Sequence, residues 1–352
     1  MRIRLLFVPL ALLAVAAAVP AAAQPGIDDA RRAAQQAYRR AMADARELYQ
    51  GRQGAEQTET FSRRIKVGRD GRVSISNISG SITVTAASGD EVSIDAVKRG
   101  RGDRSQLGRV SIVVDERPGR VDVRTDYGRP FPDRAFRDNY VSVDYTVVVP
   151  VGTSLEVNSI SGRVKVDGVR GSTRLASVSG NISSSNTPNV EYLRTVSGEV
   201  DLANISHDGS LSVSSVSGNL DFNGVKAKSL ELNTVSGEIR LRDAAVERLS
   251  AKGLSGGVEY MGTLVRNGRY EVNSHSGNVR FTLADNTGFE LNASSFSGSV
   301  RSDFQMTIGG DGTQDIGRRR GPRNESLRAT FGDGSASLSL RTFSGNIAIL
   351  RK

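Results

Sequence analysis

Acidic side chains recur at fixed positions of a repeated sequence pattern, and such side chains could bind a metal ion or transfer protons. They lie one or three residues after the glycine of consecutive Ser-Gly pairs, and they are Glu199, Asp201, Asp221, Glu238 and Glu259. If the repeats stack, these carboxylates share one face, where they could hold Ca²⁺ or act as the acid and base of a polysaccharide-cleaving enzyme. Arg240 lies on the same face and would neutralise it. A solvated outer face is therefore the default interpretation.

Other residues with catalytic potential lack the context that their chemistry needs. The segment Gly253 to Gly257 matches the G-x-S-x-G nucleophile motif, but no helical pattern follows it and His275 is its single downstream histidine. His207 and His275 lie in different sequence environments, so they do not predict a zinc site. We therefore predict a non-catalytic protein with no catalytic residue, no metal site and no cofactor.

Clustered arginines supply the candidate binding residues. One cluster runs from Arg99 to Arg104, and the other provides the candidate ligand contacts Arg318, Arg319, Arg320 and Arg323. The formal net charge of +9 favours anionic polymers or lipids as partners. Nucleic acid is not an expected partner, because the clusters lack interleaved aromatic side chains that stack on bases. Solvated loop charges are the alternative interpretation.

Ten Ser-Gly pairs place these residues in a repeating frame. Eight of the glycines follow one another at intervals of 18 to 21 residues, between Gly162 and Gly298. A period near 20 residues is typical of stacked structural repeats. We predict that the ten glycines form the structural repeat turns: Gly80, Gly162, Gly180, Gly198, Gly218, Gly237, Gly256, Gly277, Gly298 and Gly345.

Apolar residues recur at positions −7, −5, −2, +2 and +4 relative to each glycine, which is strand periodicity. Position +2 is aliphatic in all ten repeats, and position −2 is apolar in all but His275. Both columns are expected to be buried. The change from odd to even positions predicts a bend or bulge between −5 and −2. The glycine then permits a sharp corner or a close approach of two backbones.

These features predict an all-β protein, a parallel β-solenoid of coils of about 20 residues, because one two-strand repeat cannot bury its own apolar row. A large antiparallel sandwich or meander is the rival fold. Longer alternating runs between Val92 and Pro150 predict an antiparallel meander near the N-terminal end, with turns at Pro118-Gly119 and around Arg129 to Pro132. The polar, basic segment Ile308 to Arg328 is expected to form a loop.

The N-terminal residues predict export and three segments. Residues 1–23 have the charge, apolar run and alanine-rich end of a signal peptide, although a membrane anchor is the alternative. Residues 24–60 are expected to form a helical arm and linker, with a helix of about 20 residues between Asp28 and Gln50. Residues 61–352 form the repeat domain, with no transmembrane span in the mature chain. The predicted location is the periplasm or the cell surface.

Several segments resemble one family. The run Tyr145 to Val149 followed by Pro150-Val151-Gly152, the repeated Val-Ser-Gly units and the closing run Gly332 to Ile347 resemble the DUF4097 family of bacterial β-strand-repeat, adhesin-like proteins, over residues 61 to 352. The resemblance implies an envelope or surface protein, associated in some members with envelope stress, and implies no catalytic residues.

We therefore expect a binding or scaffold protein that contacts anionic envelope polymers or lipids through its basic loops. One alternative is a Ca-assisted polysaccharide lyase or hydrolase that uses the acidic face. Another is a protein-interaction module in envelope-stress sensing, which would bind an envelope protein through the N-terminal helix. The oligomeric state is not predicted by any of these patterns.

Overall fold

The computed structural model describes residues 56–101, 104–128, 141–284, 287–308 and 325–352. The chain divides into two units, Met1–Gly54 and Ala55–Lys352, and the described residues belong to the second. They form one sheet and a 3₁₀ helix, η1 (Arg104–Arg109), so the all-β class is confirmed. Within them, no helix has the length and apolarity that a membrane span requires. The predicted signal peptide and the helix between Asp28 and Gln50 lie outside the described residues.

The N-terminal part of the sheet contains both antiparallel and parallel pairs. Its strands are β1 (Glu56–Lys66), β2 (Arg72–Ser79), β3 (Ile82–Ala87), β4 (Glu91–Arg101), β5 (Ser111–Arg117), β6 (Arg120–Asp126) and β7 (Ser142–Pro150). Strand β4 pairs antiparallel with β1 and β7, and β5 and β6 form an antiparallel hairpin that turns at Pro118-Gly119 as predicted. However, β6 and β7 also pair in parallel with β2 and β3, so they join the meander to the coils.

The expected linker ends earlier than residue 60. Strand β1 begins at Glu56, and its first five residues pair with the last five of β4. The expected turn around Arg129 to Pro132 lies outside the described residues. An antiparallel strand, β1, therefore forms an edge of the sheet at this end, where a coil of the solenoid would have a parallel strand.

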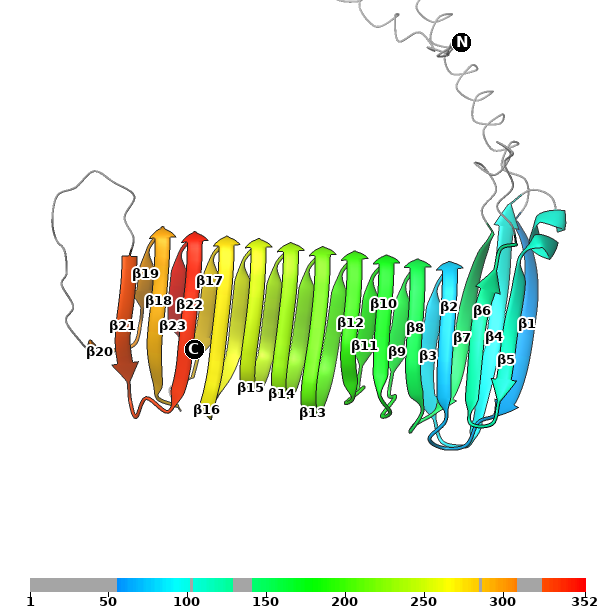
Figure 1. Cartoon of the computed structure of the whole chain (residues 1–352), viewed down its shortest axis with the longest axis horizontal. Helices are drawn as coiled ribbons and strands as arrows, with labels where there is room; N and C mark the ends of the chain where they lie inside the picture. The colour runs from blue at the N-terminus through cyan, green and yellow to red at the C-terminus, as the bar shows by residue number, and fades with distance from the viewer. Residues whose placement is uncertain (1–55, 102–103, 129–140, 285–286, 309–324) are drawn as a thin grey trace, which may run out of the picture. The chain divides into compact units, whose positions relative to one another are not determined.

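The central part consists of stacked coils with parallel strands (Figure 1). Its strands are β8 (Ser154–Ser161), β9 (Val164–Asp167), β10 (Thr173–Ser179), β11 (Ile182–Ser185), β12 (Val190–Ser197), β13 (Val200–Ser217), β14 (Leu220–Ser236), β15 (Ile239–Ser255), β16 (Val258–Ser276), β17 (Val279–Leu283), β18 (Phe289–Ser297) and β19 (Val300–Ser302). Each coil reaches its Ser-Gly pair at the end of one strand and continues in a strand of the other layer. The serines pair in register, as Ser161 does with Ser179 and Ser179 with Ser197.

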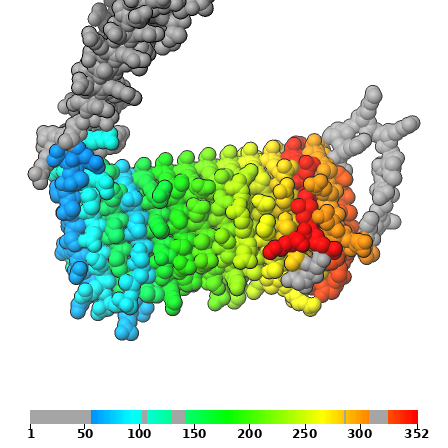
Figure 2. Space-filling model, turned by 180° about the vertical axis from the view of Figure 1, so that it is seen from behind, coloured from blue at the N-terminus to red at the C-terminus, as the bar shows by residue number. Residues whose placement is uncertain are grey.

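The C-terminal coils do not stack in sequence order. The last strands are β20 (Thr307–Ile308), β21 (Glu325–Phe331), β22 (Ala336–Ser344) and β23 (Ile347–Arg351). Strand β22 pairs in parallel with β16 on one side and β18 on the other, and β23 lies between β17 and β19. In Figure 2 the red C-terminal segment accordingly lies between yellow and orange coils. Strand β21 then pairs antiparallel with β18.

The core confirms one predicted column and contradicts the other. At position +2, nine of the ten aliphatic side chains are buried and Val300 is partly buried. At position −2 the apolar side chains are exposed, by 38% at Val196 to 53% at Leu254, so the expectation of a second buried column is wrong. Positions −7, −5 and −3 all point inward, so the one-residue shift in the alternation falls at the Ser-Gly corner and not between −5 and −2 as expected. Residue −2 therefore points outward.

Small polar side chains fill the inside of each corner, at position −3. They are Asn77, Ser159, Ser177, Thr195, Ser215, Thr234, Ser274, Ser295 and Thr342, with Gly253 in the remaining coil. Near the C-terminal end the hydroxyls donate to carbonyl oxygens of neighbouring coils, as Ser295 does to Gly345 at 2.8 Å. Those of Ser159, Ser177, Thr195, Ser215 and Thr234 have no hydrogen-bond partner among the described residues.

The corner glycines allow the coils to approach closely. At Gly162, where φ is +128°, a Cβ atom would lie 2.1 Å from the carbonyl oxygen of Gly80. The other nine corners show the same overlap with backbone atoms of a neighbouring coil. A side chain at this position would hold the coils apart, because Cβ atoms do not approach an oxygen so closely. The predicted close approach of backbone at the repeat glycines is therefore observed.

Candidate functional site

The predicted acidic residues occupy two adjacent rows just after the corners. In-register pairing places the +3 residues side by side in the order Asp201, Asp221, Arg240, Glu259 and Arg280. The +1 row beside it contains Glu199, Asn219 and Glu238. Both rows point outward because position +2, between them, is buried. Parallel stacking thus gathers carboxylates that are about 20 residues apart in the chain.

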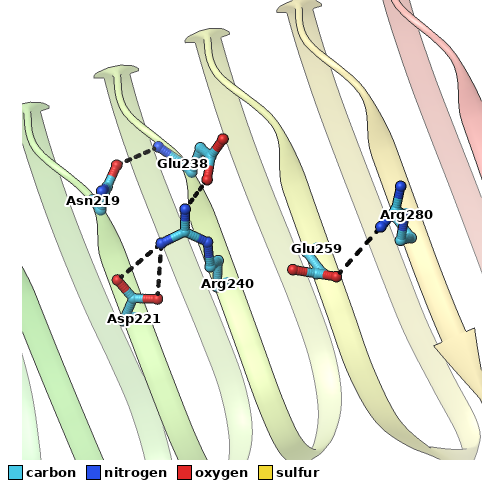
Figure 3. Close-up of polar contacts among 6 residues, drawn as sticks. All are labelled: Asn219, Asp221, Glu238, Arg240, Glu259 and Arg280. Atoms are coloured by element: carbon cyan, nitrogen blue, oxygen red, sulfur yellow. Dashed lines mark hydrogen bonds and ion pairs between the residues drawn. The ribbon is translucent and has the colours of Figure 1, made fainter.

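Arginines neutralise one half of this surface, as the sequence predicted for Arg240. The Arg240 guanidinium forms ion pairs with Glu238 and, at 3.4 Å, with Asp221 (Figure 3). Arg280 lies 3.9 Å from the Glu259 carboxylate. The backbone N–H of Glu238 donates to the Asn219 side-chain oxygen at 3.0 Å. This half is a partly exposed charge network at the surface, and such pairs add little stability.

The other half is a cluster of three carboxylates. Glu199, Asp201 and Asp221 each offer an oxygen, and these oxygens all lie within 4.8 Å of one another. Loss of hydration, and then the charges of Glu199 and Asp221, raise the pKa of the Asp201 carboxyl. Carboxylates this close could share a Ca²⁺ ion with water as the remaining ligands. The cluster sits on the outer surface of the coils.

A catalytic role would need a cleft that holds the substrate beside these acids. Two hollows along the described coils lie apart from these acids: one of about 440 Å³ is lined by Glu156, Arg174 and Glu191 among others, and one of about 330 Å³ borders the nucleophile-like motif at Gly253 and Leu254. Ser255, in the nucleophile-like motif, ends strand β15, and the chain continues into β16 instead of a helix. The described acids therefore lie on an open face, and Ser255 lacks the strand–turn–helix setting that its motif requires.

The other candidate site consists of the four arginines predicted as ligand contacts. Arg318, Arg319, Arg320 and Arg323 lie outside the described residues. Strand β20 ends at Ile308 and β21 begins at Glu325, so residues 325–328 of the expected loop belong to a strand. Strands β20 and β21 pair antiparallel, with Ile308 opposite Ala329.

His275 is exposed, and this shows what the sequence interpretation missed. Its ring stacks on Phe343 with 4.9 Å between centroids, and Phe343 stacks on Phe296 at 4.7 Å. All three belong to position −2, the column expected in the core. The inward alternation of −7 and −5 extends to −3, but position −3 is small and polar or glycine, so the apolar pattern in the sequence did not reveal an outward −2 column.

Comparison with solved structures finds several that match part or most of this chain. One is a "putative cell adhesion protein" from Clostridium sporogenes, with 10% identity, 84% of this chain and 100% of that chain covered, and a TM-score of 0.27. Another is a "putative adhesin" from Bacteroides fragilis, with 10% identity, 83% of this chain and 97% of that chain covered, and a TM-score of 0.40. A third is a "putative lipid binding protein" from Parabacteroides distasonis, with 16% identity, 64% of this chain and 90% of that chain covered, and a TM-score of 0.40. These scores carry no argument about function. No curated protein matches the chain.

A family comparison identifies the chain more directly. The model described as Toastrack DUF4097 matches residues 136–350, which is more than half of the sequence. The matched region contains the central coils and the closing coil that lies between β16 and β18. The chain therefore belongs to the DUF4097 family, as its repeated Ser-Gly segments predicted.

Proposed function

We propose that this protein is a non-catalytic β-solenoid scaffold of the cell envelope that binds anionic envelope polymers or lipids through its basic loops. The observation that supports this best is the in-register stacking of the coils. It repeats each outward position about every 4.8 Å along a face. A long surface of this kind suits a polymer or a lipid surface better than a small substrate.

The proposal includes export, with residues 1–23 as the signal peptide and the periplasm or cell surface as the location. The basic segment supplies the charge for binding, through Arg318, Arg319, Arg320 and Arg323. The strands that precede and follow it in the sequence, β20 and β21, pair antiparallel in the sheet. A positively charged segment attracts anionic groups, and salt weakens this attraction.

A binding series tests the proposal. The mature chain is incubated with lipopolysaccharide, peptidoglycan and anionic vesicles at increasing salt, and compared with a variant in which the four arginines are replaced by serine. A second variant with four lysines keeps the charge and serves as the control. We expect salt-sensitive binding that the serine variant loses and the lysine variant retains. Absence of binding at low salt would refute the proposal.

The cluster of Glu199, Asp201 and Asp221 supports a second candidate, the Ca-assisted polysaccharide lyase or hydrolase. Against it, Asp221 is already paired with Arg240, and the cluster lies on an open face. A screen of acidic polysaccharides with and without Ca²⁺ decides between the two functions. Cleavage that is lost in both Glu199→Gln and Asp221→Asn would replace the scaffold proposal, whereas salt-resistant capture of one envelope protein would favour a sensing module.

A further inference from the structure

The exposed residues at position −2 form a continuous row along the coils, which we name the apolar ridge. In spatial order it consists of Ile78, Ile160, Val178, Val196, Val216, Val235, Leu254, His275, Phe343 and Phe296. Its nine apolar members are the most exposed large apolar residues of the described chain apart from Tyr192. Neighbouring members lie one strand spacing, about 4.8 Å, apart.

The apolar ridge is too extensive for scattered surface residues. Its nine apolar members are each 38% to 53% exposed and lie side by side in one row. Singly scattered apolar residues are normal on a surface, whereas a contiguous exposed row of this kind marks an interaction surface.

Shallow grooves run beside the apolar ridge. One, of about 460 Å³, is lined by Ile78, Ile160, Val178 and Val196 together with small polar residues of positions −3 and −4. Another, of about 330 Å³, is lined by Val235 and Leu254. The apolar ridge is thus a narrow edge beside open grooves. Such grooves can accommodate flexible chains as well as rigid side chains.

The columns that flank the apolar ridge contain cations and no acids. Position −1 is serine in all ten coils, and position −4 contains Arg194, Lys252 and Arg341 among neutral residues. No ion pair involves these three cations within the described ranges. The carboxylates of the candidate site lie on the other side of the glycine corner, at +1 and +3.

This charge pattern discriminates between two possible occupants. If two copies paired through their ridges, flanking cations would meet in a surface whose flanking columns supply no carboxylate to pair with them. A lipid surface with anionic headgroups offers both the apolar interior and the opposite charge. Serine hydroxyls at position −1 can also donate hydrogen bonds to headgroup oxygens.

We propose that the apolar ridge is a lipid-docking edge, which inserts into the headgroup–acyl boundary while Arg194, Lys252 and Arg341 contact anionic headgroups. This inference rests on the proposed envelope location, but it uses a different surface from the basic segment. The rod lies along the membrane with its coil corners in contact with lipid. Contacts of the three cations with anionic headgroups make this binding depend on salt and on anionic lipid, while insertion of the apolar side chains lets part of it persist at high salt.

Single-cysteine labelling tests the insertion, because the natural chain has no cysteine. An environment-sensitive fluorophore is attached at Val216→Cys on the ridge, or at Asn223→Cys, an exposed position in the next part of the same coil, as the matched control. The probes are mixed with phosphatidylcholine vesicles with and without phosphatidylglycerol. We expect a blue shift and quenching by acyl-chain nitroxide lipids at residue 216 and neither at residue 223.

A second variant separates the ridge from the basic segment. Replacement of Val178, Val196, Val216 and Val235 by threonine keeps side-chain shape and strand preference while it removes apolar surface. We expect at least tenfold weaker vesicle binding with an unchanged circular dichroism spectrum. The variant with serines at Arg318, Arg319, Arg320 and Arg323 should lose salt-sensitive polymer binding yet keep the blue shift.

Each outcome has a defined meaning. If the threonine variant binds vesicles like the natural protein, or if residues 216 and 223 respond equally, the lipid-docking edge is refuted. A blue shift at residue 216 that depends on protein concentration without vesicles, with cross-linking between copies, would also refute it in favour of self-association. Failure of polymer capture together with a preserved blue shift would refute the proposed function and leave the ridge proposal standing.

Discussion

Replacement of a corner glycine should separate adjacent coils, and Gly218→Ala is the most informative case. The new Cβ atom would lie 2.0 Å from the Gly198 carbonyl oxygen, so the backbones must move apart by about 1 Å to reach the shortest contact that Cβ atoms tolerate. The φ angle of +153° adds strain of about 1–3 kcal/mol for a residue with a side chain.

Separation of the coils would weaken the hydrogen bonds on either side of the corner. The N–H of Gly198 donates to Ser217 at 3.1 Å, and the N–H of Gly218 donates to Ser236 at 3.0 Å. Each contributes about 1 kcal/mol. With the backbone strain, the free energy of unfolding should fall by about 3–5 kcal/mol.

Urea unfolding followed by far-UV circular dichroism measures this loss. Because long repeat arrays can unfold in stages, the midpoint of each transition is compared before any free energy is extracted. Gly89→Ala is the control for backbone strain alone, since Gly89 has φ +140° but no atom within 4 Å of a Cβ. Its loss should stay within about 1–3 kcal/mol. Equal losses in the two variants would refute the argument from coil contact.

The hydroxyls and charges of the coils support four further predictions. Ser295→Ala should lower the free energy of unfolding by about 1 kcal/mol, because the Ser295 hydroxyl donates to a carbonyl at 2.8 Å. Ser177→Ala removes a hydroxyl that has no partner among the described residues, so it should be neutral or stabilising. Urea unfolding measures both changes. Asp201→Asn should stabilise at neutral pH, since the raised pKa of Asp201 makes its charge unfavourable above the ordinary aspartate pKa; a gain that persists in acid would contradict this. Asp167→Asn should destabilise at neutral pH, because hydrogen bonds from Ser185 and Asn186 lower the pKa of Asp167, and the loss should fade as the pH drops through that lowered pKa. Tyr260→Phe should cost about 1–3 kcal/mol, because the buried hydroxyl donates its one proton to the Thr263 carbonyl at 2.8 Å, with the Ala244 carbonyl 3.1 Å away. An unchanged melting temperature would contradict that reasoning.

Much of the candidate site could be predicted from the sequence because its geometry follows from the repeat. Because the strands stack in parallel and in register, residues one repeat apart in the chain lie one strand spacing apart in space. Asp221 and Arg240 therefore meet as expected. The sequence could not predict which acids would pair with arginine and which would cluster, since the rotamers of exposed side chains are set by all their neighbours.

The sequence by itself determined the all-β class, the repeat length, the buried +2 column and the need for glycine at the corners, because strand alternation and backbone contact are local consequences of residue type and period. Only the tertiary structure decided two other features. The −2 column faces outward because the corner, rather than hydrophobicity, sets side-chain direction where the strand turns. The closing coil lies between β16 and β18. The coils have similar strand edges, so only their long-range pairing determines which coil lies next to which.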